Sequence, residues 1–513
     1  MDAFHTVTVS GRRLFMFKPL FLLAFLVGLV LTSSSGCART AAKGLDSTKQ
    51  ATVKEFIDVL NSKAPARIKT FIEKNCSTDT PVAARLDRMS KLAEQRAPIT
   101  ILRFGKEGPL EVSALIEDTN KERLSLKVQF TTDDPPKIAR LLIGDPEEMD
   151  APAPKDYTGW TDLASLTESI RTDTKNPAMG IAIIRDGKLE QTVAGVRVNN
   201  GKDAVGVDEP WSIGSIGKPI CSTVIGKLIE MGKLDWNTTL GEALSDMPMK
   251  DSYKSATLEQ LMHHRGGVPE DPGMRRPEVQ RIVNGATDPT KIRENYARDI
   301  LQREPIGKPG ERFAYSNAGY ALLGVIAERV THKPYEQLVK ELVFEPLGLK
   351  HSYTGAEKLP EARPSGHMRG PNGLEEANFS GPMEILYAPA GGGTFMSLAD
   401  LAKFGEAHML GMQGKDGLLK SATVKRLHQG IPEVPGMTGG RMYACGWGIE
   451  QFPGIQTMQT HNGSNGTMRA QVAFFPEANL VVASFVNAGG ETEPSPPLQA
   501  ILAVAGRYAK AGK

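Results

Sequence analysis

The sequence predicts a two-domain protein of the α/β (α+β) class. We expect a small α+β domain at residues 48–147 and a larger domain at 155–513 that combines an antiparallel sheet with a helical subdomain. The length of 513 residues exceeds what one ordinary domain holds. A proline-rich stretch, MDAPAP at residues 149–154, is typical of a linker. On both sides of it, apolar residues change from helical spacing to the period of two that strands show.

Composition and charge narrow the possible functions. Hydrophobic residues make up 40% and charged residues 23%, as in soluble globular proteins. The formal net charge is +2 without a long basic run, so we expect no nucleic-acid partner. Beyond Cys37, the cysteines Cys76, Cys221 and Cys445 have neither disulfide nor metal-site spacing. Cys221 is expected to be a small buried hydrophobic residue.

Residues 1–38 have the three parts of an export signal. Basic residues at positions 12, 13 and 18 precede an apolar run at 19–31, and small residues follow. The run is shorter than the roughly 20 residues that span a bilayer, and a permanent N-terminal anchor is the alternative. Ser34-Ser35-Gly36-Cys37 resembles a bacterial lipobox, although Ser34 replaces the usual leucine. Lipidation of Cys37 and plain cleavage after Ala38 both stay open. We expect an exported protein, periplasmic or extracellular, either free or lipid-anchored to a bacterial membrane.

The small domain is predicted to contain helices followed by a sheet. Apolar residues recur at helical spacing between residues 50 and 97. Four segments then alternate with a period of two, at 99–104, 110–116, 124–130 and 138–143. Helices followed by such an antiparallel sheet predict an α+β unit. It loosely resembles the cone-shaped NTF2-like domains, and no catalytic cluster is visible in it.

In the large domain, both ends of the chain are expected to contribute strands to one sheet. A helix is predicted at residues 163–170. Strands at 179–184 and 189–196 flank Asp186-Gly187, a strong signal for a two-residue hairpin turn. A second hairpin is predicted at residues 470–486 and a closing helix at 498–508, with mostly helical sequence in between.

Ser215 and Lys218 form the first candidate catalytic motif, in WSIGSIGKP at residues 211–219. An apolar helical run follows. If Ser215 opens that helix, Lys218 lies one turn along the same face, with its amine beside the hydroxyl. A serine nucleophile requires such a neighbour, because its hydroxyl barely ionises at neutral pH. The helix N-terminus also offers N–H groups to an oxyanion. The alternative is a capping serine with a surface lysine.

Residues 214–234 resemble the serine β-lactamase family, which includes class C enzymes, D-alanyl-D-alanine peptidases and related esterases. The resemblance covers residues 155–510 and implies a β-lactamase/transpeptidase-like catalytic domain. It also implies a second motif, which PGERFAYSNAGY at residues 309–320 supplies. Tyr315 is expected to be the general base for Ser215 and then the acid for the leaving group, because a nearby ammonium favours the phenolate. Asn317 is expected to bond Lys218 or the substrate. The alternative for Tyr315 is a buried aromatic residue with a satisfied hydroxyl.

The resemblance implies a third motif on a late strand, Lys-Thr-Gly or His-x-Gly, and His461-Asn462-Gly463 matches the second form. His461 is expected to project into the cleft and to bond Tyr315 or a substrate carboxylate. Gly463 is expected to leave room for the substrate to approach the strand. The backbone N–H of Ser464, with that of Ser215, is implied to form the oxyanion hole. The alternative for His461 is a core or surface residue.

Further segments resemble the family, with some departures. LEQLMHHRGG at residues 258–267 places His264 at a histidine that is generally structural. Residues 391–401 match a glycine-rich segment before a helix, and residues 443–448 resemble the first strand of the C-terminal sheet. Gly217 replaces the usual Ser or Thr, Arg265-Gly266 replaces Thr-Ser, and His461 replaces the lysine of class C enzymes. The last departure makes efficient β-lactam hydrolysis less expected, because a histidine at neutral pH holds a carboxylate less reliably than a lysine.

Together these motifs predict acyl transfer to water through an acyl-enzyme on Ser215. The expected partner is a small ester, amide or peptide, including cell-wall-derived ones, and no metal or organic cofactor is expected. Carboxylesterase, D-amino-acid peptidase and weak β-lactamase activities all fit. The alternative from a different class is a non-catalytic cell-envelope protein that senses penicillin or peptidoglycan with the same cleft.

Overall fold

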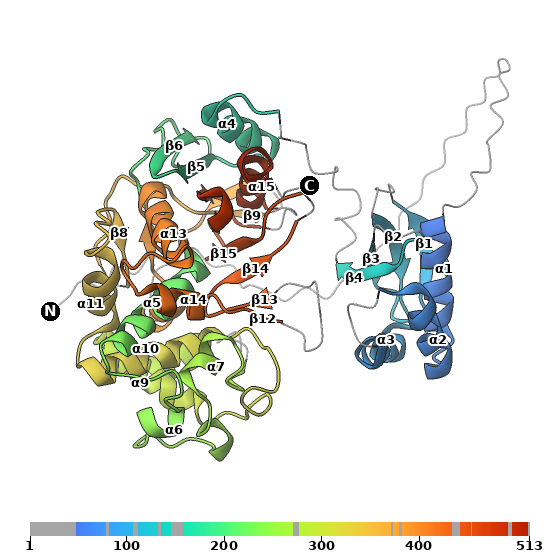
Figure 1. Cartoon of the computed structure of the whole chain (residues 1–513), viewed down its shortest axis with the longest axis horizontal. Coiled ribbons are helices and arrows are strands. Elements are labelled where there is room, and N and C mark those ends of the chain that lie inside the picture. The colour runs from blue at the N-terminus through green and yellow to red at the C-terminus, as the bar shows by residue number, and fades with distance from the viewer. Residues whose placement is uncertain are drawn as a thin grey trace, which may run out of the picture. The chain divides into compact units, whose positions relative to one another are not determined.

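A computed structural model describes residues 48–77, 82–105, 111–131, 135–144, 157, 159–269, 276–355, 357–370, 373–378, 382–432, 442–452, 454–490 and 495–510. Figure 1 shows their helices and strands. The predicted export signal with Cys37, and the proline-rich stretch at 149–154, lie outside the described residues. Within them, no helix has both the length and the apolar character needed to cross a bilayer.

The small N-terminal domain is an α+β unit, as predicted. Helices α1 (Thr48–Asn61), α2 (Pro65–Asn75) and α3 (Val82–Arg96) precede an antiparallel sheet in the order β1-β2-β3-β4. Its strands are β1 (Thr100–Phe104), β2 (Glu111–Glu117), β3 (Arg123–Phe130) and β4 (Ile138–Gly144). The apolar face of the sheet and the helices bury a core of their own, which includes Val53, Phe56, Ile68, Ile116 and Val128.

The large domain is built on an eight-stranded antiparallel sheet in the order β12-β13-β14-β15-β16-β17-β5-β6. The two ends of the large domain meet in this sheet, as predicted, because Val482 of β17 pairs with Ile183 of β5. Asp186 and Gly187 have positive φ angles of 52° and 72°, as a two-residue hairpin turn requires. The strands are β5 (Ala178–Arg185), β6 (Lys188–Gly195), β12 (Ile431–Pro432), β13 (Met442–Tyr443), β14 (Gly448–Glu450), β15 (Met458–Ser464), β16 (Arg469–Phe475) and β17 (Leu480–Val486).

One expectation about this sheet is wrong. Residues 443–448 do not form its first strand: they close a tight hairpin in which Tyr443 of β13 pairs with Gly448 of β14, and β12 lies outside them. Gly446 makes the bend with a φ of 80°.

Helices cover both faces of the sheet. One face packs against α4 (Leu163–Asp173) and α15 (Pro496–Tyr508), and its core includes Ile181, Val482 and Val504. The other face packs against α13 (Leu398–Met412), and its core includes Phe474 and Phe404. Strands buried on both faces explain the nearly continuous apolar character of β5 and β17.

The remaining helices make up a helical region of the large domain (Figure 1). Its helices are α5 (Gly217–Glu230), α6 (Leu240–Ala243), α7 (Leu258–Met262), α8 (Arg276–Val283), α9 (Pro289–Ile300), α10 (Asn317–Thr331), α11 (Tyr335–Val339), α12 (Pro382–Leu386) and α14 (Ser421–Leu427). Two small antiparallel sheets pair β7 (Trp211–Ser212), β11 (Phe395–Met396) and β8 (Ser352–Tyr353), and separately β9 (His367–Gly370) and β10 (Gly373–Glu376).

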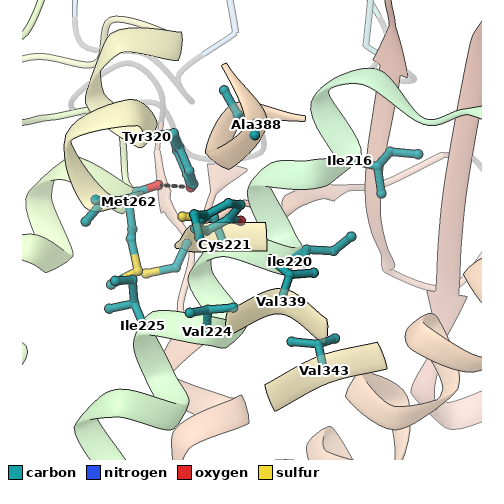
Figure 2. Close-up of a cluster of buried hydrophobic side chains, with 14 of the residues drawn as sticks. Ile216, Ile220, Cys221, Val224, Ile225, Met262, Tyr320, Val339, Val343 and Ala388 are labelled. Carbon is teal, nitrogen blue, oxygen red and sulfur yellow. Dashed lines mark hydrogen bonds between the residues drawn. The ribbon is translucent and has the colours of Figure 1, made fainter. Parts of the chain in front are cut away.

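Helix α5 is buried, and Figure 2 shows apolar side chains packed around it. Ile220, Cys221 and Val224 on the helix belong to one apolar cluster with residues of other segments, among them Met262, Tyr320, Val339 and Ala388. The Tyr320 hydroxyl donates a hydrogen bond of 2.8 Å to the Met262 carbonyl. Cys221 is buried, as expected, and burial raises the pKa of its thiol to about 12. Every residue from Gly217 to Gly226 is buried, so the core holds the first turn of α5 in a fixed position.

Candidate active site

Ser215 lies in a short 3-10 turn, Gly214–Ile216, directly before α5. We expected Ser215 to open the helix itself, whereas α5 begins two residues later, at Gly217. Gly214 enters this turn with a φ of 48°, in the left-handed region that glycine adopts without strain. Ser215 is only partly buried, whereas its neighbours Gly214 and Ile216 are buried.

Lys218 is fully buried and its amine contacts three oxygen atoms. Nζ lies 3.0 Å from Ser215 Oγ, 2.6 Å from Asn317 Oδ1 and 3.2 Å from the Ala390 carbonyl oxygen. A carbonyl oxygen can only accept, so Asn317 and Ala390 each take one hydrogen of the amine. The third tetrahedral position faces Ser215. It carries a hydrogen when Lys218 is an ammonium, and a lone pair that can accept the serine proton when it is an amine.

Tyr315 lies on the loop before α10, as predicted. Ser316 caps the helix, because its Oγ accepts a hydrogen bond of 3.1 Å from the N–H of Gly319. Lys218 Nζ lies 4.6 Å from the centre of the Tyr315 ring. Among the described residues, no hydrogen bond joins the Tyr315 hydroxyl to Ser215 or Lys218. The structure therefore places the aromatic ring of Tyr315 at the site. It shows no hydrogen bond through which the Tyr315 hydroxyl could take the Ser215 proton directly.

His264 holds the segment that carries Tyr315 and Asn317. Its Nδ1 accepts a hydrogen bond of 3.0 Å from the N–H of Ser316, and its ring lies 4.3 Å from the Tyr315 ring. Burial, followed by the nearby charge of Lys218, keeps the pKa of His264 well below its ordinary value. A neutral imidazole is needed here, because only an unprotonated Nδ1 can accept. This geometry is consistent with a structural histidine.

His461 lies on β15 and is buried, with a partner the sequence did not indicate. Its Nε2 is 3.0 Å from the Tyr443 hydroxyl, and its Nδ1 is 2.6 Å from the Asn462 carbonyl oxygen. The carbonyl can only accept, so Nδ1 carries a hydrogen, and in the neutral ring Nε2 accepts from Tyr443. Among the described residues, His461 forms no hydrogen bond with Tyr315, which we had expected. Its partner is the Tyr443 hydroxyl instead.

Gly463 lets β15 approach the turn that carries Ser215. A Cβ on Gly463 would lie 1.8 Å from the Ile213 carbonyl oxygen and 2.8 Å from the Ser215 nitrogen. This differs from the expectation that Gly463 leaves room for the substrate, because the missing side chain points at the turn. A Cβ on Gly214 would lie 2.5 Å from the Ser464 nitrogen. The amides of Ser215 and Ser464 thus border the same close contact.

The absence of a side chain at Gly217 has a packing reason. A Cβ there would lie 2.3 Å from Cα of Gly391, and a Cβ on Gly391 would lie 1.8 Å from the Gly214 carbonyl oxygen. Gly217 and Gly391 therefore let the Ser215 turn and the segment after Ala390 touch backbone to backbone. That contact brings the Ala390 carbonyl within reach of Lys218.

The described residues offer no metal site at this position. Within those ranges, no three His, Cys, Asp or Glu side chains are grouped as metal ligands. His263, next to His264, contacts the carbonyl oxygens of Glu259 and Gln429.

A model of the Beta-lactamase family matches residues 163–506. The chain belongs to this family. It is 25% identical over 351 residues to penicillin-binding protein 4 of Amycolatopsis lactamdurans, covering 66% of this chain and 87% of that protein. A solved structure of the octameric penicillin-binding protein homologue from Pyrococcus abyssi is 25% identical, with a TM-score of 0.56 over 67% of this chain and 78% of that one.

The D-amino acid amidase from Ochrobactrum anthropi SV3 shares the fold, at 21% identity and a TM-score of 0.56 over 67% of this chain and 99% of that one. These findings confirm the predicted Beta-lactamase family resemblance and the β-lactamase/transpeptidase-like fold. Membership of this family also identifies the protein as an enzyme of the serine hydrolase class.

The site gathers most of the residues that the sequence singled out. Ser215, Lys218 and Asn317 are joined by hydrogen bonds, and the Tyr315 ring packs beside Lys218. The sequence did not indicate two contributors, the Ala390 carbonyl and the Tyr443 hydroxyl. Both lie next to glycine-rich segments, at residues 391–393 and 446–448, which is the signal that could have drawn attention to them.

Proposed function

We propose that the protein hydrolyses an ester or amide bond through an acyl-enzyme on Ser215. One observation carries this proposal: two acceptors fix the Lys218 amine so that its third position faces Ser215 Oγ at 3.0 Å. An amine held in this way can accept the serine proton or stabilise the alkoxide. A capping serine with a surface lysine would not show this arrangement, because Lys218 is fully buried.

The steps follow from the positions of these groups. Ser215 Oγ attacks the carbonyl carbon while its proton passes to Lys218, and the backbone N–H groups of Ser215 and Ser464 stabilise the oxyanion. The tetrahedral intermediate collapses, the carbon–leaving-group bond breaks, and the leaving group takes the proton. Water then attacks the ester of Ser215, losing one proton to the same base, and the released serine is protonated again. Atoms and charge balance, and no redox partner is involved.

A small ester, amide or peptide is the proposed substrate class. The named relatives, a penicillin-binding protein and a D-amino acid amidase, support amide and peptide substrates. His461 occupies the third motif and bonds Tyr443, which argues against efficient β-lactam hydrolysis because no lysine is offered to a substrate carboxylate there. We also propose that the protein is exported through residues 1–38, with or without a lipid on Cys37.

Labelling tests the proposal directly. A fluorophosphonate probe and a fluorescent penicillin are incubated with the wild-type protein and with Ser215→Ala. We expect the fluorophosphonate to label only the wild type, and short-chain p-nitrophenyl esters to be hydrolysed only by it. Failure of both reactions in the folded wild type would favour the non-catalytic sensor. Comparing esters, D-alanyl peptides and nitrocefin then ranks the three activities.

A further inference from the structure

Four buried polar side chains form a chain of hydrogen bonds through the core between α5 and β15. Thr223 Oγ1 lies 3.0 Å from His408 Nε2, His408 Nδ1 lies 3.0 Å from His428 Nε2, and His428 Nδ1 lies 3.1 Å from Gln459 Oε1. None of the four residues is more than 7% exposed. They come from α5, α13, the end of α14 and β15, respectively. We call these four residues the polar chain.

Aromatic rings surround the polar chain, so its members depend on one another for hydrogen bonds. The Trp447 ring lies 5.0 Å from the His408 ring and 4.9 Å from the His428 ring, and the Phe474 ring lies 5.2 Å from that of His428. A polar group buried among such rings costs free energy unless it is hydrogen-bonded. The chain supplies a partner to all four ring nitrogens. Removing one member therefore leaves its neighbour unpaired.

The hydrogen bonds of the polar chain run in one direction. Burial lowers the pKa of His408 well below its ordinary value and that of His428 to about 4, so both rings are neutral near pH 7. A neutral imidazole donates from one nitrogen and accepts at the other. Gln459 Oε1 can only accept, so His428 donates to it and His408 donates to His428. The Thr223 hydroxyl, whose other acceptor is the Pro219 carbonyl oxygen at 2.8 Å, then donates to His408.

The two ends of the polar chain lie on the elements that carry the reacting groups. Thr223 follows Lys218 on α5 by little more than one helical turn. Gln459 precedes Ser464, whose amide borders the Ser215 turn, on the same strand. The chain therefore connects the helix of the amine to the strand of the expected oxyanion donor.

Helix α5 and strand β15 are thus held together at two places. The first is the close approach of Gly463 to the Ile213 carbonyl, next to Ser215. The second is the polar chain, about 12 Å from Ser215 along the helix, at Thr223, and about 13 Å from Gly463 along the strand, at Gln459. A single contact leaves the angle between a helix and a strand free to change. A second attachment at this distance fixes it.

We propose that the polar chain is a positioning element for hydrolysis, which fixes the angle between α5 and β15 and thereby the place of the Lys218 amine relative to the Ser464 amide. This inference rests on the proposed function, because it assigns a role in the same reaction. The four side chains are buried, so they act through these two elements and not on the substrate. Loss of the chain should therefore lower kcat and leave KM nearly unchanged.

Variants at the two ends of the polar chain test this role. Thr223→Val and Gln459→Met each remove a polar group and keep the size of the side chain. Each should lower kcat on p-nitrophenyl acetate about tenfold, with KM within about threefold, since a displacement of about 1 Å in a catalytic arrangement can cost about 100-fold. Thr223→Ser keeps the hydroxyl and should retain kcat within about twofold.

Thr167→Val is the matched control. Thr167 is a buried residue of α4, and its hydroxyl donates to the Leu163 carbonyl oxygen at 2.8 Å, as that of Thr223 can to Pro219. It is not a member of the polar chain. Its replacement should leave kcat within about twofold of the wild type, even where the Tm falls.

The double variant distinguishes one connected chain from two separate packing defects. Thr223 and Gln459 are linked through the two histidines, so breaking either end already disrupts the whole chain. Thr223→Val combined with Gln459→Met should therefore lower kcat about tenfold, like either single variant. Two independent effects would multiply to about 100-fold.

Each outcome decides between these alternatives. A lower Tm with unchanged kcat in the single variants, or a loss of about 100-fold in the double variant, would overturn the positioning role and leave the proposed function in place. If one single variant does not fold, the kcat of the other decides, because each breaks the chain at its own end. A wild type that hydrolyses no p-nitrophenyl ester and resists the fluorophosphonate probe would overturn the proposed function and this role with it.

Discussion

Gly463→Ala tests how closely β15 must approach the turn that carries Ser215. An ideal Cβ at this position lies 1.8 Å from the Ile213 carbonyl oxygen, and real Cβ contacts essentially never fall below 3.0 Å. Strand or turn must therefore move by about 1.2 Å, and both contacts involve backbone atoms that cannot rotate away. A displacement of about 1 Å in a catalytic arrangement can cost about 100-fold in rate. We expect kcat to fall by about that factor.

The assay measures kcat and KM on p-nitrophenyl acetate together with the fluorophosphonate labelling rate, at a temperature well below the Tm of each protein. Gly417→Ala is the matched control, because a Cβ there meets nothing within 4 Å, and it should retain the wild-type rate. If folded Gly463→Ala keeps its rate within threefold, the close approach of β15 is not required for catalysis and our description of the oxyanion site is wrong.

Of three other predictions, two concern residues around Ser215 and the third concerns a buried histidine. Asn317→Ala removes an acceptor that orients Lys218, so kcat should fall about 100-fold with recovery in Asn317→Asp, and unchanged kcat in the alanine variant would contradict this. Tyr443→Phe removes the hydroxyl that bonds Nε2 of His461 and should lower kcat/KM about tenfold. The control Tyr253→Phe should leave kcat/KM unchanged, and equal effects of the two variants would refute the role of Tyr443. Burial lowers the pKa of His428 to about 4 in the folded protein. As the pH falls below 6.5, the unfolded chain therefore binds a proton on this histidine before the folded protein does, and the free energy of unfolding decreases. Urea unfolding should show a loss of about 2 kcal/mol between pH 7 and pH 5 from this residue, and a His428→Gln variant with the same loss would contradict it.

Local patterns were enough to predict most of the fold. Strands β5 and β6 followed from apolar segments around Asp186-Gly187, because that turn needs two residues that tolerate positive φ. The Ser215 and Lys218 contact followed from a spacing of three residues at a helix start. Such features depend on neighbours in the sequence, so a single chain reveals them.

The features that the sequence did not reveal depend on distant backbone contacts. Lys218 bonds a main-chain oxygen of Ala390, 172 residues away, and a carbonyl has no residue-type signature. The Tyr443 and His461 contact joins two strands separated in the sheet by β14, so it required the strand order. Strand β12 has only two residues, too few to show a period.

Intact-protein mass spectrometry of a trapped intermediate tests the central claim most directly. The protein is mixed with a slowly deacylating ester or penicillin, quenched in acid within seconds, and digested to locate any added mass. We predict one acyl group on the peptide that contains Ser215, absent from Ser215→Ala and from Lys218→Met. Turnover of the same compound with the added mass on another residue, or with no dependence on Ser215, would contradict the account.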